Sequence, residues 1–115
     1  MGQVKVGRIR ELNDAFRKSP WPGPKALGRT LVTAGIHAHG PAFVLKVLNA
    51  VAGFDQFSED NDPHGEHDFG NFTLAGRKFF WKIDAYDADT RFGSEDPTDP
   101  AKTTRVLTIM LAEEY

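Results

Sequence analysis

The chain has 115 residues, of which 40% are hydrophobic and 26% are charged, with no cysteine and a formal net charge of −2 at pH 7. This composition is typical of a globular protein, and the length suits a single domain, residues 1–115, with a modest core. The lack of cysteine excludes disulfides, thiolate metal sites and a cysteine nucleophile. No stretch is apolar enough for a signal peptide or a membrane span, so we expect a cytoplasmic protein without membrane contacts.

The N-terminal residues predict an amphipathic helix followed by a loop. Apolar residues recur at helical spacing from Ile9 to Phe16, which predicts a helix over about residues 7–18. Residues 19–29 are rich in proline and glycine, which exclude a helix or a central strand there. We expect an irregular loop in which Trp21 is the one aromatic anchor.

A strand and a second helix follow. Residues 30–36, TLVTAGI, are apolar and β-branched, as in a buried strand. Gly40 and Pro41 are typical of a helix start, and Gly53 is a plausible stop. Because its apolar residues fall on one face, this helix is expected to be the main cover of the sheet.

The second half of the chain predicts strands. Residues 71–74 and 79–84 alternate apolar and polar side chains around Ala75-Gly76, which indicates a β-hairpin with a tight turn. Residues 106–111 are apolar at both alternating positions except Thr108, so we expect a strand buried on both faces, with a short helix as the alternative. The predicted fold is therefore α+β, with two helices packed on a small, mostly antiparallel sheet, in the order helix, strand, helix, hairpin, strand.

The charges are distributed unevenly along the chain. Residues 1–54 carry eight Lys/Arg and two acids, for a net charge of +6, whereas residues 55–99 carry twelve acids and four Lys/Arg, for −8. If the two halves occupy different faces, the molecule has a bipolar field. The alternative is that folding interleaves the two halves and the field cancels.

The acidic residues gather in two loops that flank the hairpin: the first acidic loop, residues 57–68, and the second acidic loop, residues 87–100. Because a hairpin brings its open ends together, we expect both loops at one edge of the sheet. Such an edge complements a basic groove on another protein, although a solvated loop surface is the alternative. The expected partner-binding residues are Glu59, Asp60, Asp62, Glu66, Asp68, Asp87, Asp89, Glu95 and Asp96.

The first acidic loop also holds two histidines, which raises the question of a metal site. Imidazole and carboxylate groups together suit zinc, manganese or iron. His64 and His67 share a face only on a helix, however, and Pro63 and Gly65 disfavour a helix here. We therefore expect no cofactor, and we keep a metal-dependent hydrolase or nuclease that uses His64, His67 and nearby carboxylates as the alternative function.

Nucleic-acid binding has one argument, which is a group of cations in the first third of the chain. The acidic segment would repel a duplex, and the pI near 6.0 is far below that of a typical nucleic-acid-binding domain. We therefore do not expect direct nucleic-acid binding. The cations are Arg8, Arg10, Arg17, Lys18, Lys25 and Arg29.

Three longer motifs stand out in the second half of the chain: NDPHGEHDFG (residues 61–70), FFWKIDAYD (residues 79–87) and DPAKTTRVLTIMLAEEY (residues 99–115). They resemble a family of small bacterial proteins that is classed only as a domain of unknown function. The shorter segments RELNDAFR (residues 10–17) and LVTAG (residues 31–35) are also similar to it, whereas the SPWPGPK insertion is not. The resemblance therefore runs from about Ile9 to Tyr115.

The resemblance implies a genetic context but no site residues. Proteins of this kind are similar to accessory products of plasmids and other mobile elements, among which small anti-restriction and anti-CRISPR proteins are frequent. Fold and context do not establish a function by themselves. The leading hypothesis is a non-enzymatic protein-binding module that acts through the acidic edge, in this context as an inhibitor of a host defence or nucleic-acid-processing complex.

Overall fold

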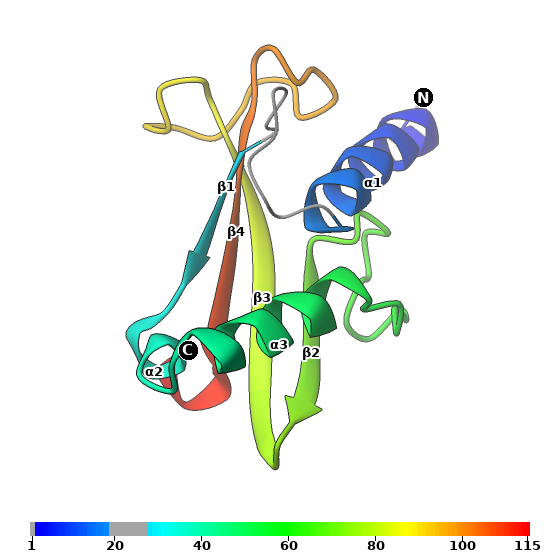
Figure 1. Cartoon of the computed structure of the whole chain (residues 1–115). Coiled ribbons are helices and arrows are strands. Elements are labelled where there is room, and N and C mark those ends of the chain that lie inside the picture. Colours follow the sequence, from blue (N-terminus) through cyan, green and yellow to red (C-terminus); the bar gives the residue numbers. More distant parts are fainter. Residues whose placement is uncertain (1, 19–27) are drawn as a thin grey trace.

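The computed structural model describes residues 2–18 and 28–115, with side chains from Lys5 onward, and this part of the chain is built on a four-stranded sheet (Figure 1). The spatial order of the strands is β1-β4-β3-β2. β1 runs parallel to β4, and the other neighbours are antiparallel. The predicted α+β class and mostly antiparallel sheet are therefore confirmed. The strands are β1 (Gly28–Val32), β2 (Phe69–Leu74), β3 (Arg77–Tyr86) and β4 (Thr104–Leu111).

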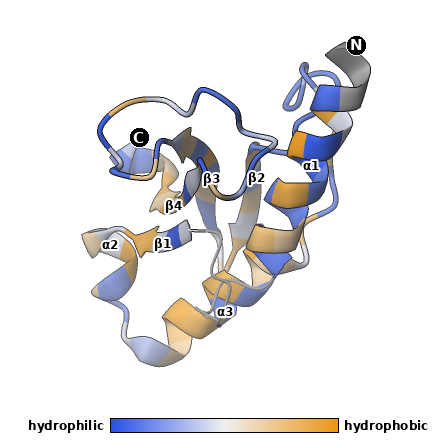
Figure 2. Ribbon diagram, turned by 90° about the horizontal axis from the view of Figure 1, so that it is seen from above, coloured by the Kyte–Doolittle hydropathy of each residue, from blue (hydrophilic) through white to orange (hydrophobic). Residues whose placement is uncertain are grey.

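The two long helices, α1 and α3, lie on one side of this sheet (Figure 2). The predicted N-terminal helix is longer than expected, because it begins at Gly2 rather than near residue 7. The predicted Pro-rich loop around Trp21 lies outside the described residues. Within the described part of the chain, no helix combines the length and apolarity that crossing a membrane requires. The helices are α1 (Gly2–Lys18), α2 (Ala34–His37), α3 (Pro41–Ala52) and the 3-10 helix η1 (Ala112–Glu114).

The hydrophobic core lies between α3 and the helix-facing side of the sheet. Val47 and Val51 of α3 pack with Trp81 of β3 and Ile109 of β4, and all four are almost fully buried. The expectation of a last strand buried on both faces is wrong for the outer face at Val106 and Thr108, which are only half-buried, whereas Met110 on that face is buried. The reason is that α1 and α3 cover only one face of the sheet.

The predicted strand over residues 30–36 ends earlier than expected. β1 stops at Val32, and the chain turns into α2 at Ala34. Glu114 of η1 explains the change, because its carboxylate accepts hydrogen bonds from the Thr33 hydroxyl and from the Gly35 backbone N–H. A carboxylate from the far end of the chain thus accepts a free backbone N–H in the first turn of α2. The β-propensity of residues 30–36 does not predict such a contact.

The carboxylate of Glu114 is expected to give the fold a pH-dependent increment of stability. The Thr33 hydroxyl and the backbone N–H groups of Leu111 and Gly35 hold the pKa of Glu114 below its ordinary value of 4.5. This increment is present above that ordinary pKa and is lost as the pH falls through the lowered pKa. Glu114→Gln should therefore cost about 0.5 kcal/mol at pH 7 after solvent screening, and less than that at pH 3, in thermal unfolding.

The matched control is Glu113→Gln, because Glu113 is exposed and makes no hydrogen bond or ion pair within the described residues. Its stability difference from the parent protein should stay close to zero at both pH values. Equal losses in the two variants would show that the net charge, not the bonds made by Glu114, sets the effect.

The hairpin between β2 and β3 is confirmed in position and register. Leu74 pairs with Arg77 across a two-residue turn, in which Ala75 has φ 52° and Gly76 has φ 75°. Positive φ at both central residues defines a type I′ turn, whose twist matches that of the strands. Glycine adopts this conformation freely, but alanine is strained in it.

Ala75→Asn is expected to raise the free energy of unfolding by about 1 kcal/mol, because asparagine tolerates the left-handed conformation that alanine adopts here at a cost. Chemical denaturation with an unchanged m-value would measure the gain. Gly76→Ala is the opposing control and should lower stability, because it adds the same strain at the second turn position. A neutral or destabilising Ala75→Asn would contradict this account of the turn.

Candidate functional site

The first acidic loop closes on itself through its own polar groups. The Asn61 side chain accepts a hydrogen bond from the Ser58 N–H at 3.0 Å and donates one to the Gln56 carbonyl at 2.8 Å. Asp62 is buried and accepts the His67 backbone N–H at 3.2 Å. Such local bonds from Asn and Asp to the backbone are turn chemistry. Part of the predicted acidic surface is therefore used to build the loop.

His67 joins this loop to α1. Its Nδ1 lies 2.9 Å from a carboxylate oxygen of Asp14, and its Nε2 lies 3.7 Å from a carboxylate oxygen of Asp62. The imidazole also stacks flat on Phe57, with 3.6 Å between ring centroids. The backbone of His67 has φ 53°, an uncommon conformation for a residue other than glycine. The side chain is thus held on both nitrogens and on one ring face.

This arrangement bears directly on the two histidines considered as metal ligands. Both ring nitrogens of His67 face carboxylates, and His64 is exposed on the loop surface. Over residues 2–18 and 28–115, no group of three or more His, Asp or Glu side chains is placed to hold a metal ion. In the described residues the geometry therefore assigns His67 a structural role.

Arg17, one of the cations considered above for nucleic-acid binding, is buried. Only 1% of it is exposed, and its guanidinium donates to the backbone carbonyls of Val51 at 2.7 Å and Phe54 at 2.9 Å. It also pairs with Asp14 at 3.1 Å. A cation at the C-terminus of a helix satisfies free carbonyls and the helix dipole. Arg17 therefore caps α3 and is not available to bind phosphate.

A second buried arginine connects the two acidic loops. Arg105 of β4 donates to the Asn13 side chain at 2.8 Å and to the Pro97 carbonyl of the second acidic loop at 2.6 Å. Asn13 in turn donates to the Glu66 carbonyl of the first acidic loop at 2.9 Å. Burial lowers the pKa of the Arg105 guanidinium. Polar side chains of α1 and β4 thus hold both loops in place from inside the molecule.

The two acidic loops leave the same end of the hairpin, as expected, but at different heights. Phe69, the first residue of β2, pairs with Lys82, and β3 continues four residues further to Tyr86. At the usual rise per residue, the second acidic loop begins about 13 Å beyond the first. Basic and polar side chains of α1 contact the first loop, so the two halves of the chain are partly interleaved.

The predicted acidic residues consequently have different surroundings. Burial raises the pKa of Glu66 and of Asp68, and hydrogen bonds from Thr98 lower the pKa of Asp96. These carboxylates, together with buried Asp62, are partly engaged within the fold. The members that remain exposed are Glu59, Asp60, Asp89 and Glu95, and Asp87 is half-buried.

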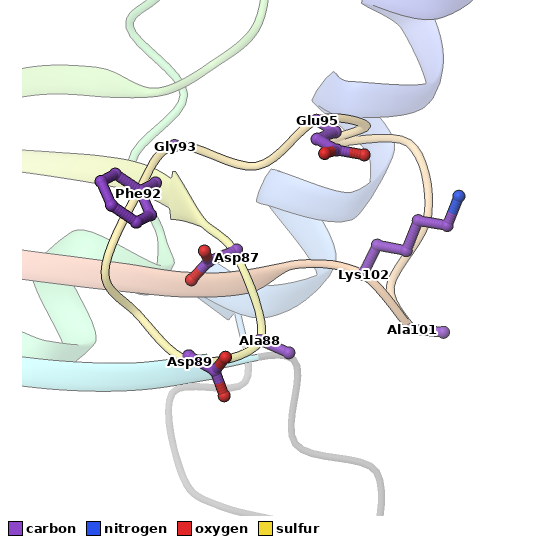
Figure 3. Close-up of a pocket in the computed structure, with 8 residues that line it drawn as sticks. All are labelled: Asp87, Ala88, Asp89, Phe92, Gly93, Glu95, Ala101 and Lys102. Carbon is purple, nitrogen blue, oxygen red and sulfur yellow. The ribbon is translucent and has the colours of Figure 1, made fainter.

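The second acidic loop folds into a compact concavity. The Asp87 N–H donates to the Phe92 carbonyl at 2.8 Å, and the Ser94 N–H donates to the Ala85 carbonyl at 3.0 Å, so residues 92–94 run back along the end of β3. The concavity, here called the acidic pocket, has a volume of about 590 Å³. Its lining is Asp87, Ala88, Asp89, Phe92, Gly93, Glu95, Ala101 and Lys102 (Figure 3).

The carboxylates of the acidic pocket have no cationic partner in the described part of the chain. Asp87, Asp89 and Glu95 form no ion pair there, although Asp87 accepts a hydrogen bond from the Arg91 backbone N–H at 3.0 Å. The Lys102 ammonium group extends away from the two aspartates (Figure 3). Phe92, at the rim, is 73% exposed. Carboxylates beside an exposed aromatic ring suit an ammonium or guanidinium group. Sequence reasoning had not placed Phe92 beside these carboxylates, because the contact depends on the fold of the loop.

The structure therefore defines a small α+β domain whose open hairpin end carries an acidic, aromatic-edged pocket. The chain belongs to the DUF3768 family, proteins of unknown function, whose family model matches residues 32–114. This confirms the resemblance for the three long motifs, whereas the segment of α1 that also looked similar lies outside the match. No curated protein and no solved structure gave a significant match.

Proposed function

We propose that the protein is a non-enzymatic protein-binding module that recognises a basic segment of its partner through the acidic pocket. The observation that carries this proposal is that, among the described residues, Asp87, Asp89 and Glu95 form no ion pair and line one pocket with exposed Phe92. A lysine or arginine side chain of the partner would form charge-assisted hydrogen bonds with the carboxylates and contact the ring. Exposed Glu59 and Asp60 of the first acidic loop would contribute mainly to electrostatic steering.

The kind of partner follows from the same chemistry. A basic groove that normally holds nucleic acid offers closely spaced lysines and arginines, and carboxylates of the acidic pocket would occupy positions otherwise taken by phosphates. Together with the mobile-element context that the family resemblance implies, this supports a role as an inhibitor of a host defence or nucleic-acid-processing complex, of the anti-restriction or anti-CRISPR type.

Neutralising the pocket is expected to weaken binding to a basic probe. The triple variant Asp87→Asn, Asp89→Asn, Glu95→Gln should bind a fluorescent nona-arginine peptide at least about tenfold more weakly than the parent protein, a loss of about 1.4 kcal/mol. Fluorescence anisotropy at two salt concentrations measures this, and the affinity of the parent should fall as salt rises.

The matched control changes the net charge equally but away from the pocket, by Glu11→Gln, Asp55→Asn and Glu113→Gln. All three control residues are exposed. We expect this variant to lose no more than about twofold in affinity, because exposed charges at a distance are screened. Equal losses in the two triple variants would mean that total charge, and not the pocket, attracts the peptide.

A further inference from the structure

The outer edge of β2 carries backbone groups that the sheet does not use. The Ile83 N–H donates to the Asp68 carbonyl at 2.8 Å, and the pairing continues without a break to the turn. Because hydrogen-bonded and non-hydrogen-bonded pairs alternate in an antiparallel ladder, the N–H and C=O groups of Phe69, Asn71 and Thr73 point away from β3. Within the described residues, no backbone bond to these outward groups is made by another segment.

This edge also lacks the features that normally prevent strands from pairing. Natural edge strands are protected by charged side chains, proline or bulges. β2 has the sequence FGNFTL, with no charged residue and no proline, and its register against β3 shows no bulge. An unprotected edge of six residues is therefore either a liability or a surface that is paired in the working protein.

We propose that the protein forms a two-fold symmetric dimer in which β2 pairs antiparallel with β2 of a second copy. The register that uses every outward group places Asn71 opposite Asn71 of the second copy and Phe69 opposite Thr73 of the second copy. This register forms about six hydrogen bonds between the chains and joins the two sheets into one. Antiparallel pairing of identical strands is self-complementary, as a closed dimer requires.

The charges at the two ends of the hairpin favour a second copy over an unrelated peptide. Asp68 lies at the start of β2, and Arg77 and Lys78 lie just after the turn. Antiparallel pairing brings the acidic end of each copy beside the basic end of the other, which fixes the register.

Mass and hydrogen exchange of the unmodified protein test the proposal. At about 100 µM, light scattering should give twice the chain mass of 12.8 kDa. Amide exchange followed by NMR should protect the outward amides of Asn71 and Thr73 about as well as the inward amides of Phe72 and Leu74. A mass of 12.8 kDa together with rapid exchange of the outward amides would overturn the proposal.

Variants at one position separate the edge from other surfaces. Asn71→Pro removes an outward N–H that the sheet itself does not use, so the variant should fold and be monomeric, with Phe72 still protected. Asn71→Thr keeps the N–H and should remain dimeric. A folded Asn71→Pro variant that stays dimeric would place the interface elsewhere. If the Asn71→Pro variant fails to fold, the exchange pattern of the unmodified protein decides whether the β2 edge is paired. The triple variant of the acidic pocket should remain dimeric, because the pocket is separate from the β2 edge.

Discussion

Replacing Arg17 with methionine is expected to lower the free energy of unfolding by about 3–5 kcal/mol. The substitution keeps much of the apolar stem but removes the guanidinium that donates to the carbonyls at the end of α3. The buried Phe54 carbonyl would lose this donor, the Val51 carbonyl would keep only backbone donors, and Asp14 would lose its ion pair with Arg17. The lost guanidinium also lies over the rings of Phe57 and Trp81, at 5.4 and 5.2 Å from their centroids.

Chemical denaturation of the purified variants measures this loss of stability. Two control variants test whether the loss comes from the guanidinium of Arg17. Arg8→Met removes a surface cation that pairs with Glu11 at 3.3 Å, and it should change stability by less than about 1 kcal/mol. Arg17→Lys keeps the charge but not the planar fork, so an intermediate loss is expected. If Arg17→Met cost no more than Arg8→Met, the capping role assigned to Arg17 would be wrong.

Gly70→Ala is expected to destabilise the protein by about 3 kcal/mol, because the new methyl group would overlap a buried ring. A Cβ atom at this position would lie 2.5 Å from Nε1 and 2.7 Å from Cε2 of Trp81. The indole cannot move aside easily, since Trp81 is fully buried and packs edge-on against Phe54 at 5.5 Å between centroids. Thr73→Ala, on the exposed face of the same strand, should cost less than about 1 kcal/mol.

A double-mutant cycle identifies the cause of this loss. Trp81→Phe removes the part of the ring that approaches Gly70, at the cost of a smaller core residue. If the clash dominates, Gly70→Ala should be much less harmful in the Trp81→Phe background, with a coupling energy of about 1–2 kcal/mol. Additive losses would show that backbone conformation at Gly70, rather than contact with the ring, makes glycine necessary.

The elements that could be predicted depend on short stretches of chain. α3 begins at Pro41 and ends at Ala52, because proline suits the first helical position and one face of the segment is apolar. The hairpin was predicted with its turn in place, because Ala75 and Gly76 separate two alternating runs. Prediction failed where a distant group takes part: Glu114, near the other end of the chain, accepts hydrogen bonds from Thr33 and Gly35, where the predicted strand gives way to α2.

The acidic residues illustrate the same division. Their concentration in two loops beside the hairpin is a property of the sequence, and both loops do leave the same end of it. The exposure of each acidic residue is not a property of the sequence. Asp62 is buried and bonds to the His67 backbone, whereas Asp89 and Glu95 are exposed around the acidic pocket. Sequence spacing cannot distinguish these positions, since the difference arises from contacts with α1 and from the folding of the second acidic loop.

The sequence by itself determined the class of the fold, the order of most elements, the hairpin turn and the uneven distribution of charge, because each depends on residues close together in the chain. Only the tertiary structure decided that Arg17 and Arg105 are buried structural cations and that β1 joins the sheet parallel to β4. Those outcomes depend on hydrogen-bond partners far away in sequence, such as the Val51 carbonyl for Arg17 and Asn13 for Arg105. A buried polar group needs a hydrogen-bond partner, and the tertiary structure decides which residue supplies it. A local sequence pattern does not contain that information.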